Sequence, residues 1–264
     1  MKKMRKLIPA LAMLLVSAVM MSTASFAWFS MNTSVTASGM SVTAKNESKY
    51  LQIIAGADTS FHETEAQVSA TAVNASKALR PTSLVSSIAE DKKSVVEYEG
   101  STTLVWVEAF SNDPNVPDKA TANEYVNVTT AATSLPPTAE QIEGGATDSN
   151  LYTLYNIFQV RMNPTTGVKL AGPLSVADVS VTATGEGNAD LLPALRVAIV
   201  GTNKGAIYDS TGTLVAGNAA ITTEVTDTAS QVKVFVYFDG EDDAAFSNAV
   251  KSGNYAVTFT LTIP

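Results

Sequence analysis

Residues 22–44 (STASFAWFSMNTSVTASGMSVTA) constrain this chain more than any other stretch. Their first part ends an apolar segment with small residues, and the remainder alternates apolar and polar residues as a half-buried strand does. Cleavage within this stretch would place a β-strand directly at the new N-terminus. Such a strand can pair within its own domain or with a neighbouring molecule, and the sequence leaves both arrangements open.

The first 27 residues have the order of a secretory signal peptide. Four of the first six residues are basic, an apolar run covers 7–21, and small residues lead to Ala27. A membrane anchor is the alternative, because an apolar helix of about 20 residues spans a bilayer. The small residues favour cleavage between Ala27 and Trp28. We therefore expect a secreted protein of the cell surface or extracellular matrix, which meets the membrane only before cleavage.

The charge balance excludes two classes of partner. Without residues 1–27, 13 basic residues face 25 acidic ones, a formal charge of −12. Nucleic-acid binding requires clustered Lys and Arg, and anionic lipid attracts basic segments, so neither is expected. The chain has no cysteine, which excludes disulfides and thiolate metal sites. Nothing in the sequence indicates a cofactor.

The composition and the periodicity both indicate an all-β fold. Thr, Val, Ala and Ser are frequent, which suits strands. The clearest alternating or apolar strand segments are residues 151–162, 195–200, 231–238 and 255–263. About ten such segments, separated by Gly, Pro and Asn turns, predict an antiparallel β-sandwich of the jelly-roll type with one or two short helices. The predicted domain covers 45–264, after an N-terminal strand over 28–44, and it contains an irregular insertion around 111–150.

Several local predictions are specific enough to test. Residues 94–98 and 103–110 look like a hairpin around Glu99-Gly100. Residues 66–78 have a weak helical pattern, and 242–251 predict a helix that begins at Asp and is followed by Gly253. The apolar phase of the N-terminal stretch shifts by one residue at Gly39, as at a bulge or bend.

Motifs that carry chemistry are scarce. His62 is the only histidine, and its HETEA context lacks the second histidine of a zinc-protease helix. A turn with four carboxylates contains Asp239, Glu241, Asp242 and Asp243. These oxygens are calcium candidates, although their spacing is not that of an EF-hand loop. The alternative is that they cap the helix that follows, where negative charge is favourable.

Residues 103–110 (TLVWVEAF) offer a further candidate surface. Alternation allows Glu108 to face solvent together with Trp106 and Phe110, which would form a partly exposed aromatic patch. The alternative is that these aromatic residues belong to the edge of the core.

The two ends of the chain resemble a known family. The matching features are the small residues before Ala27, the pair Trp28-Phe29, the V-x-A-x-G-x-x-V-x-A run over 35–44, and a C-terminal strand followed by Gly240-Glu241-Asp242. With these features the chain resembles the TasA/camelysin-like secreted proteins of Gram-positive bacteria, which carry a SipW-type signal peptide. The resemblance covers the chain ends and leaves the middle unmatched.

The resemblance implies a jelly-roll subunit of a biofilm matrix fibre, with copies of itself and accessory matrix proteins as partners. In such fibres the freed N-terminal strand inserts into the next subunit, and the face formed by Phe29, Met31, Thr33, Val35 and Ala37 would make that contact. Camelysin relatives have been described as proteases, but this chain lacks the necessary His and Glu constellation, so no enzyme activity is expected.

Two other functions stay open on the sequence. The first is a surface-displayed module that binds a polysaccharide or a host ligand through loops 111–123 and 136–150. The second is a hydrolase that uses carboxylates such as Glu108 or Asp239, which would need to lie about 5–10 Å apart in a cleft.

Overall fold

A computed structural model describes most of the chain beyond residue 150 and parts of the chain before it. The described residues are 35–36, 41–46, 51–56, 67–71, 78–79, 82–91, 94–108, 126–127, 153–163, 172–184, 191–246 and 254–264. Within these ranges, no helix has both the length and the apolar character needed to cross a membrane.

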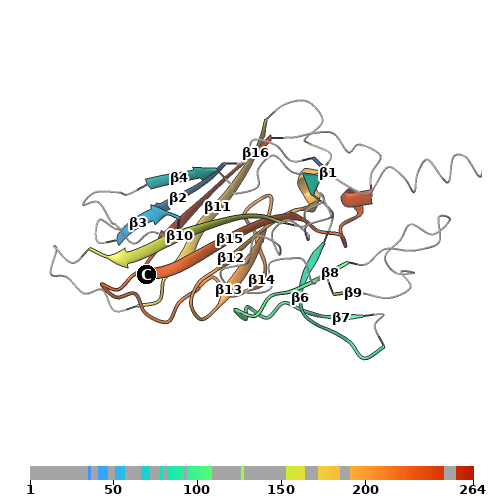
Figure 1. The fold of residues 1–264 in the computed structure, drawn as a ribbon, viewed down its shortest axis with the longest axis horizontal. Helices are drawn as coiled ribbons and strands as arrows, with labels where there is room; N and C mark the ends of the chain where they lie inside the picture. Colours follow the sequence, from blue (N-terminus) through green and yellow to red (C-terminus); the bar gives the residue numbers. More distant parts are fainter. Residues whose placement is uncertain are drawn as a thin grey trace, which may run out of the picture.

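The described residues form an all-β fold with three larger, stacked sheets and a separate two-stranded sheet of Val35–Thr36 and Ala78–Leu79 (Figure 1). The central sheet has the order β14 (Leu214–Gly217), β13 (Gly205–Asp209), β12 (Leu195–Val200), β15 (Ser230–Phe238), β10 (Leu154–Met162) and β3 (Leu51–Ala55). One outer sheet has the order β11 (Ser175–Thr184), β16 (Asn254–Thr262), β2 (Ser41–Asn46) and β4 (Gln67–Thr71). The other outer sheet has the order β7 (Val95–Glu97), β6 (Ser83–Ile88), β8 (Val105–Glu108) and β9 (Val126–Asn127).

This architecture confirms the predicted all-β, sandwich-like fold. Between the described strands the pairing is antiparallel with one exception, because β2 and β16 run parallel, with Ser41 opposite Ala256. An isolated parallel bridge also joins Thr82 to Asp239. The helical content of the described residues consists of two 3-10 helices, η3 (Leu192–Ala194) and η4 (Asp243–Phe246). The predicted helix over 242–251 is therefore a single 3-10 turn in its described part.

Strand alternation on β15 builds two cores on opposite faces of the central sheet. Val232, Val234 and Val236 belong to the larger core, which lies between the central sheet and the β11–β16–β2–β4 sheet. Phe235 and Tyr237 point the other way, because successive side chains of a strand alternate between its faces. They belong to the second core, beneath the β7–β6–β8–β9 sheet.

Trp106 of β8 fills the centre of this second core. Its side chain is completely buried, and its ring meets Phe235 and Tyr237 edge-on at centroid distances of 5.7 and 4.9 Å. Such edge-to-face pairs add about 0.5–1.5 kcal/mol beyond the burial itself. Trp106 is therefore a central contact between the third sheet and the sandwich. It belongs to the core, as the alternative interpretation of residues 103–110 predicts, and not to an exposed aromatic patch.

Two local predictions are also wrong. The segments 94–98 and 103–110 do not pair with each other, because β7 and β8 both pair with β6, which lies between them. The serine-rich strand β6 has too little apolar alternation to be identified from the sequence. Residues 67–71 form the strand β4 and no helix, because pairing with β2 from Ser41 to Lys45 outweighs a weak helical pattern.

The N-terminal stretch takes part in two different ladders. Within the described ranges, β1 (Val35–Thr36) pairs with β5 (Ala78–Leu79) and with no other strand. From Ser41 onward β2 is enclosed between β4 and β16, where Val42 and Ala44 enter the core. The residues around the predicted phase shift at Gly39 lie outside the described ranges.

Candidate functional site

The acidic turn after β15 lies where the central sheet meets the third sheet. Phe238 accepts a backbone hydrogen bond from Thr82 at 2.9 Å, and Gly240 donates one to the Thr82 carbonyl at 3.0 Å. On the other side, the Asp239 amide donates to the Ala194 carbonyl at 2.7 Å. The turn is thus fixed by main-chain bonds to the start of β6 and to the end of η3.

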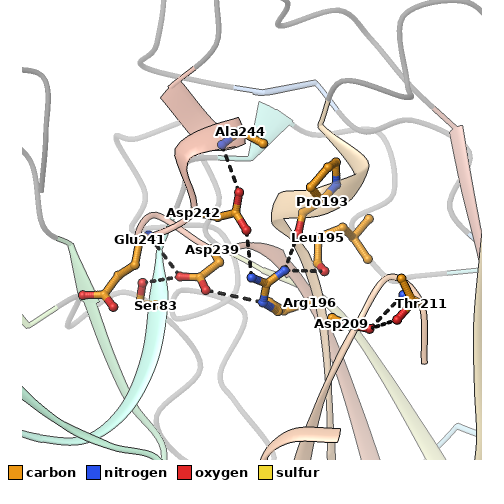
Figure 2. A network of polar contacts seen from close by, with 10 residues as sticks. All are labelled: Ser83, Pro193, Leu195, Arg196, Asp209, Thr211, Asp239, Glu241, Asp242 and Ala244. Atoms are coloured by element: carbon orange, nitrogen blue, oxygen red, sulfur yellow. Dashed lines mark hydrogen bonds and ion pairs between the residues drawn. The ribbon is translucent and has the colours of Figure 1, made fainter. Parts of the chain in front are cut away.

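Arg196 binds this turn with its whole guanidinium group (Figure 2). Its Nε lies 3.4 Å from Asp239 Oδ2, and its Nη2 lies 2.9 Å from Asp242 Oδ2. Its Nη1 donates to the carbonyl oxygens of Pro193 and Leu195. Since each nitrogen of the guanidinium has a partner, Arg196 joins the start of β12 to the turn after β15.

Asp239 is held from three sides. The Ser83 hydroxyl donates to its Oδ1 at 2.7 Å, and the Glu241 amide donates to the same oxygen at 3.0 Å. Burial raises the pKa of Asp239, and the hydrogen bonds and Arg196 offset this effect only in part. Burial together with the Asp239 charge likewise raises the pKa of Tyr237 well above its usual range.

The other calcium candidates have different surroundings. Asp242 Oδ1 accepts the Ala244 amide at 2.9 Å, so Asp242 caps η4 with one oxygen and binds Arg196 with the other. This is the capping role that the alternative interpretation of the turn predicts. Asp243 begins η4. Across the described ranges, no group of three or more His, Cys, Asp or Glu side chains is placed to hold a metal ion.

A cleft of about 200 Å³ opens beside this network. Its apolar wall comes from β6, β7, β13 and β14, and its polar residues include Glu97, Tyr98, Arg196, Asp239 and Glu241. Three carboxylates against one guanidinium give the cleft a formal charge of −2. Such a site suits a ligand with apolar side chains and a positive group.

The remaining candidate residues are only partly placed. Val35 lies on β1, opposite Leu79. Glu108 ends β8, opposite Val126. The predicted processing residues Ala27 and Trp28, the strand residues Phe29, Met31, Thr33 and Ala37, and also His62 and Phe110 lie outside the described ranges.

Two members of the network, Arg196 and Ser83, are not predicted from the sequence. A usable signal was present for Arg196, since it is the only charged residue in the apolar strand LRVAIV. A buried charge needs a counter-charge, so this position already required an acidic partner. For Ser83 no signal existed, because its role depends on contact with Asp239, 156 residues away.

The fold and the site together define a class of protein. The class is an all-β sandwich with a third sheet, in which an arginine-carboxylate network joins the layers. Neither the protein-family models nor the curated proteins include a match to this chain.

Proposed function

We propose that this protein is a secreted structural subunit of an extracellular matrix fibre, which assembles by giving its N-terminal β-strand to a neighbouring copy. The observation that carries the proposal is that β1 pairs outside the three larger sheets, in a ladder with β5 alone among the described strands. In the described residues this ladder comprises two pairs, Val35 with Leu79 and Thr36 with Ala78. By contrast, β2 pairs with β16 from Ser41 to Asn46 and with β4 from Ser41 to Lys45, so it has partners on both sides over most of its length.

This difference in pairing favours exchange of the segment that precedes Ser41. The described part of the β1–β5 ladder contributes few hydrogen bonds, and each contributes about 0.5–1.5 kcal/mol net. A donated strand recovers such bonds along its whole length in the acceptor, which is how β-strand addition gains affinity. The alternation of apolar and polar residues from Phe29 to Ala37 suits a strand with one buried face.

The carboxylate network supports a structural role over a catalytic one. Asp239 and Asp242 are both bound to Arg196, and Asp242 also caps η4. A general acid or base must exchange its proton with a substrate within hydrogen-bond reach. Asp239 and Asp242 already hold three elements together, so their role is to stabilise the fold. We therefore also propose that the protein has no enzymatic activity.

The proposal is tested by electron microscopy of the secreted protein with its native N-terminus. We expect fibres from this protein and folded monomers from a variant that lacks residues 28–37. A variant with 28–37 shuffled, so that alternation is lost while composition is kept, should also stay monomeric. Folded monomers from all three would refute the fibre proposal and favour a surface-displayed binding module for a polysaccharide or host ligand.

A further inference from the structure

We propose that the cleft between β7 and β14 is the acceptor site for the N-terminal strand, residues 28–37, of a second copy. This inference rests on the proposed function and names the surface that receives the donated strand. It identifies the ligand by chemistry, as an uncharged alternating strand that begins with a free ammonium group.

The first observation concerns strand edges. In the described part of the chain, β7 pairs only with β6, and β14 pairs only with β13, so each has one unpaired side. Val96, Leu214 and Val215 are the large apolar side chains that stay exposed there, at 44, 41 and 48%. All three lie on these two strands. Proteins usually protect edge strands with charge, and exposed apolar residues on an edge indicate a pairing surface.

The second observation is that both edges border the same cleft. Val95 and Glu97 of β7 and Val215 and Ala216 of β14 line it together. Beyond β7, the Gly100 carbonyl accepts the Gly205 amide at 2.7 Å, and a Cβ at Gly100 would lie 3.2 Å from the Gly217 Cα. The backbone that follows β7 therefore lies against the end of β14, and residues of both edge strands border the cleft.

The third observation is charge complementarity between the cleft and the N-terminal segment. The cleft has a formal charge of −2, from Glu97, Asp239 and Glu241 against Arg196. Residues 28–44 contain no charged side chain, although the whole chain has a formal charge of −8. After cleavage at Ala27, the segment would also carry the α-ammonium of Trp28. The negatively charged cleft therefore does not repel this segment, whereas it would repel an acidic surface of another copy.

The position of β1 favours a donor from another molecule. Val35, at the end of the proposed donor segment, is held by β5 in a ladder that lies well apart from β7 and β14 (Figure 1). The described end of the segment is thus held away from the cleft of its own copy. Donation of the segment to the cleft of another copy gives a head-to-tail contact, which propagates into a filament when it does not close into a ring.

The test is binding of a synthetic peptide, WFSMNTSVTA, with a free N-terminus and a dye at its C-terminus, to the monomeric mature chain. We expect Val215→Lys to raise the dissociation constant of the peptide by about tenfold or more. Thr182→Lys is the matched control, because Thr182 is exposed on β11, an edge of the opposite outer sheet, and should leave binding unchanged. Val96→Lys provides a second edge variant, and thermal melting establishes that each variant folds.

Two modified peptides separate strand addition from simple adhesion. A peptide methylated at alternate backbone nitrogens should lose binding, since it cannot form a ladder. An N-acetylated peptide should bind more weakly than the free amine, and Glu97→Gln should weaken the free peptide more than the acetylated one. Equal binding by Val215→Lys, Val96→Lys and the unchanged chain would overturn the inference.

Assembled material distinguishes failure of this inference from failure of the proposed function. A photo-reactive residue at 215 should cross-link to residues 28–37 of another, isotopically labelled copy, whereas one at 182 should not. Fibres whose position 215 links elsewhere would keep the proposed function and refute the acceptor site. Peptide binding at the cleft without fibres would keep the acceptor site and refute the fibre.

Discussion

Replacing Tyr208 by phenylalanine should stabilise the protein, which is the opposite of what most core substitutions do. Tyr208 of β13 is 5% exposed in the larger core, and its hydroxyl is buried without a hydrogen-bond partner. An unsatisfied buried polar group costs about 1–3 kcal/mol of stability. Removing the oxygen also loses its van der Waals contacts, but this loss is smaller. We expect Tyr208→Phe to raise the free energy of unfolding by about 1 kcal/mol.

Tyr98→Phe is the matched control, with the opposite sign expected. Tyr98 is also buried, at 3% exposed, but its hydroxyl donates to the Ser101 carbonyl. Removing that hydroxyl should lower the free energy of unfolding by about 1 kcal/mol, because a satisfied hydrogen bond is lost. Both differences are measurable by urea and thermal unfolding. In thermal unfolding, each 1 kcal/mol shifts the midpoint temperature by about 2–4 °C for a chain of this size.

The pH dependence of unfolding at alkaline pH tests the Tyr208 hydroxyl a second time. Burial raises the pKa of Tyr208 from 10.0 to about 12. Above pH 10 the unfolded chain releases this proton first, so stability falls by up to about 1.4 kcal/mol per pH unit until the folded group titrates near pH 12. Tyr208→Phe removes this loss, so its advantage should grow between pH 10 and 12. A destabilised Tyr208→Phe variant, or a constant difference across that range, would refute the unpaired hydroxyl.

Three further substitutions test the packing and the network. Arg196→Met should lower the free energy of unfolding by about 2–4 kcal/mol, because Asp239 keeps its burial without a counter-charge. Since protonation removes that charge, the deficit in urea unfolding should shrink toward low pH, and a pH-independent deficit would contradict this reasoning. Trp106→Leu should cost about 2–4 kcal/mol in urea unfolding, since it leaves a cavity beneath the third sheet, and a loss below about 1 kcal/mol would contradict its central position. Gly212→Ala should be more destabilising in thermal melts than Gly56→Ala: both have positive φ, at 85° and 91°, but only at Gly212 would a Cβ lie 2.2 Å from a backbone oxygen.

The sequence predicts the fold class because strand periodicity is a local property. In β15, alternate positions enter two different cores, and the continuous apolar segment QVKVFVYF already reflects a strand buried on both faces. The β13–β14 hairpin is likewise local, since Asp209 accepts the amides of Thr211 and Thr213 within one turn.

Long-range pairing explains what the sequence did not predict. Glu99-Gly100 has the composition of a hairpin turn, yet the strands on either side pair with β6, because Trp106 and Leu84 share one core there. The carboxylates of the turn after β15 were identified, but their role depends on Arg196, 43 positions before Asp239 in the numbering. No local pattern encodes that contact.

The parallel pairing of β2 with β16 sets the order in which this molecule can fold. Ser41 faces Ala256, so β2 can pair with the nearby β4 early, but its ladder with β16 needs almost the whole chain. Bringing such distant segments together is entropically slow. A chain that emerges from a membrane N-terminus first, as its predicted signal peptide implies, would deliver β16 last. Until then β2 and the segment before it would stay available to other partners, so the time spent in export would itself influence whether a strand is kept or given away.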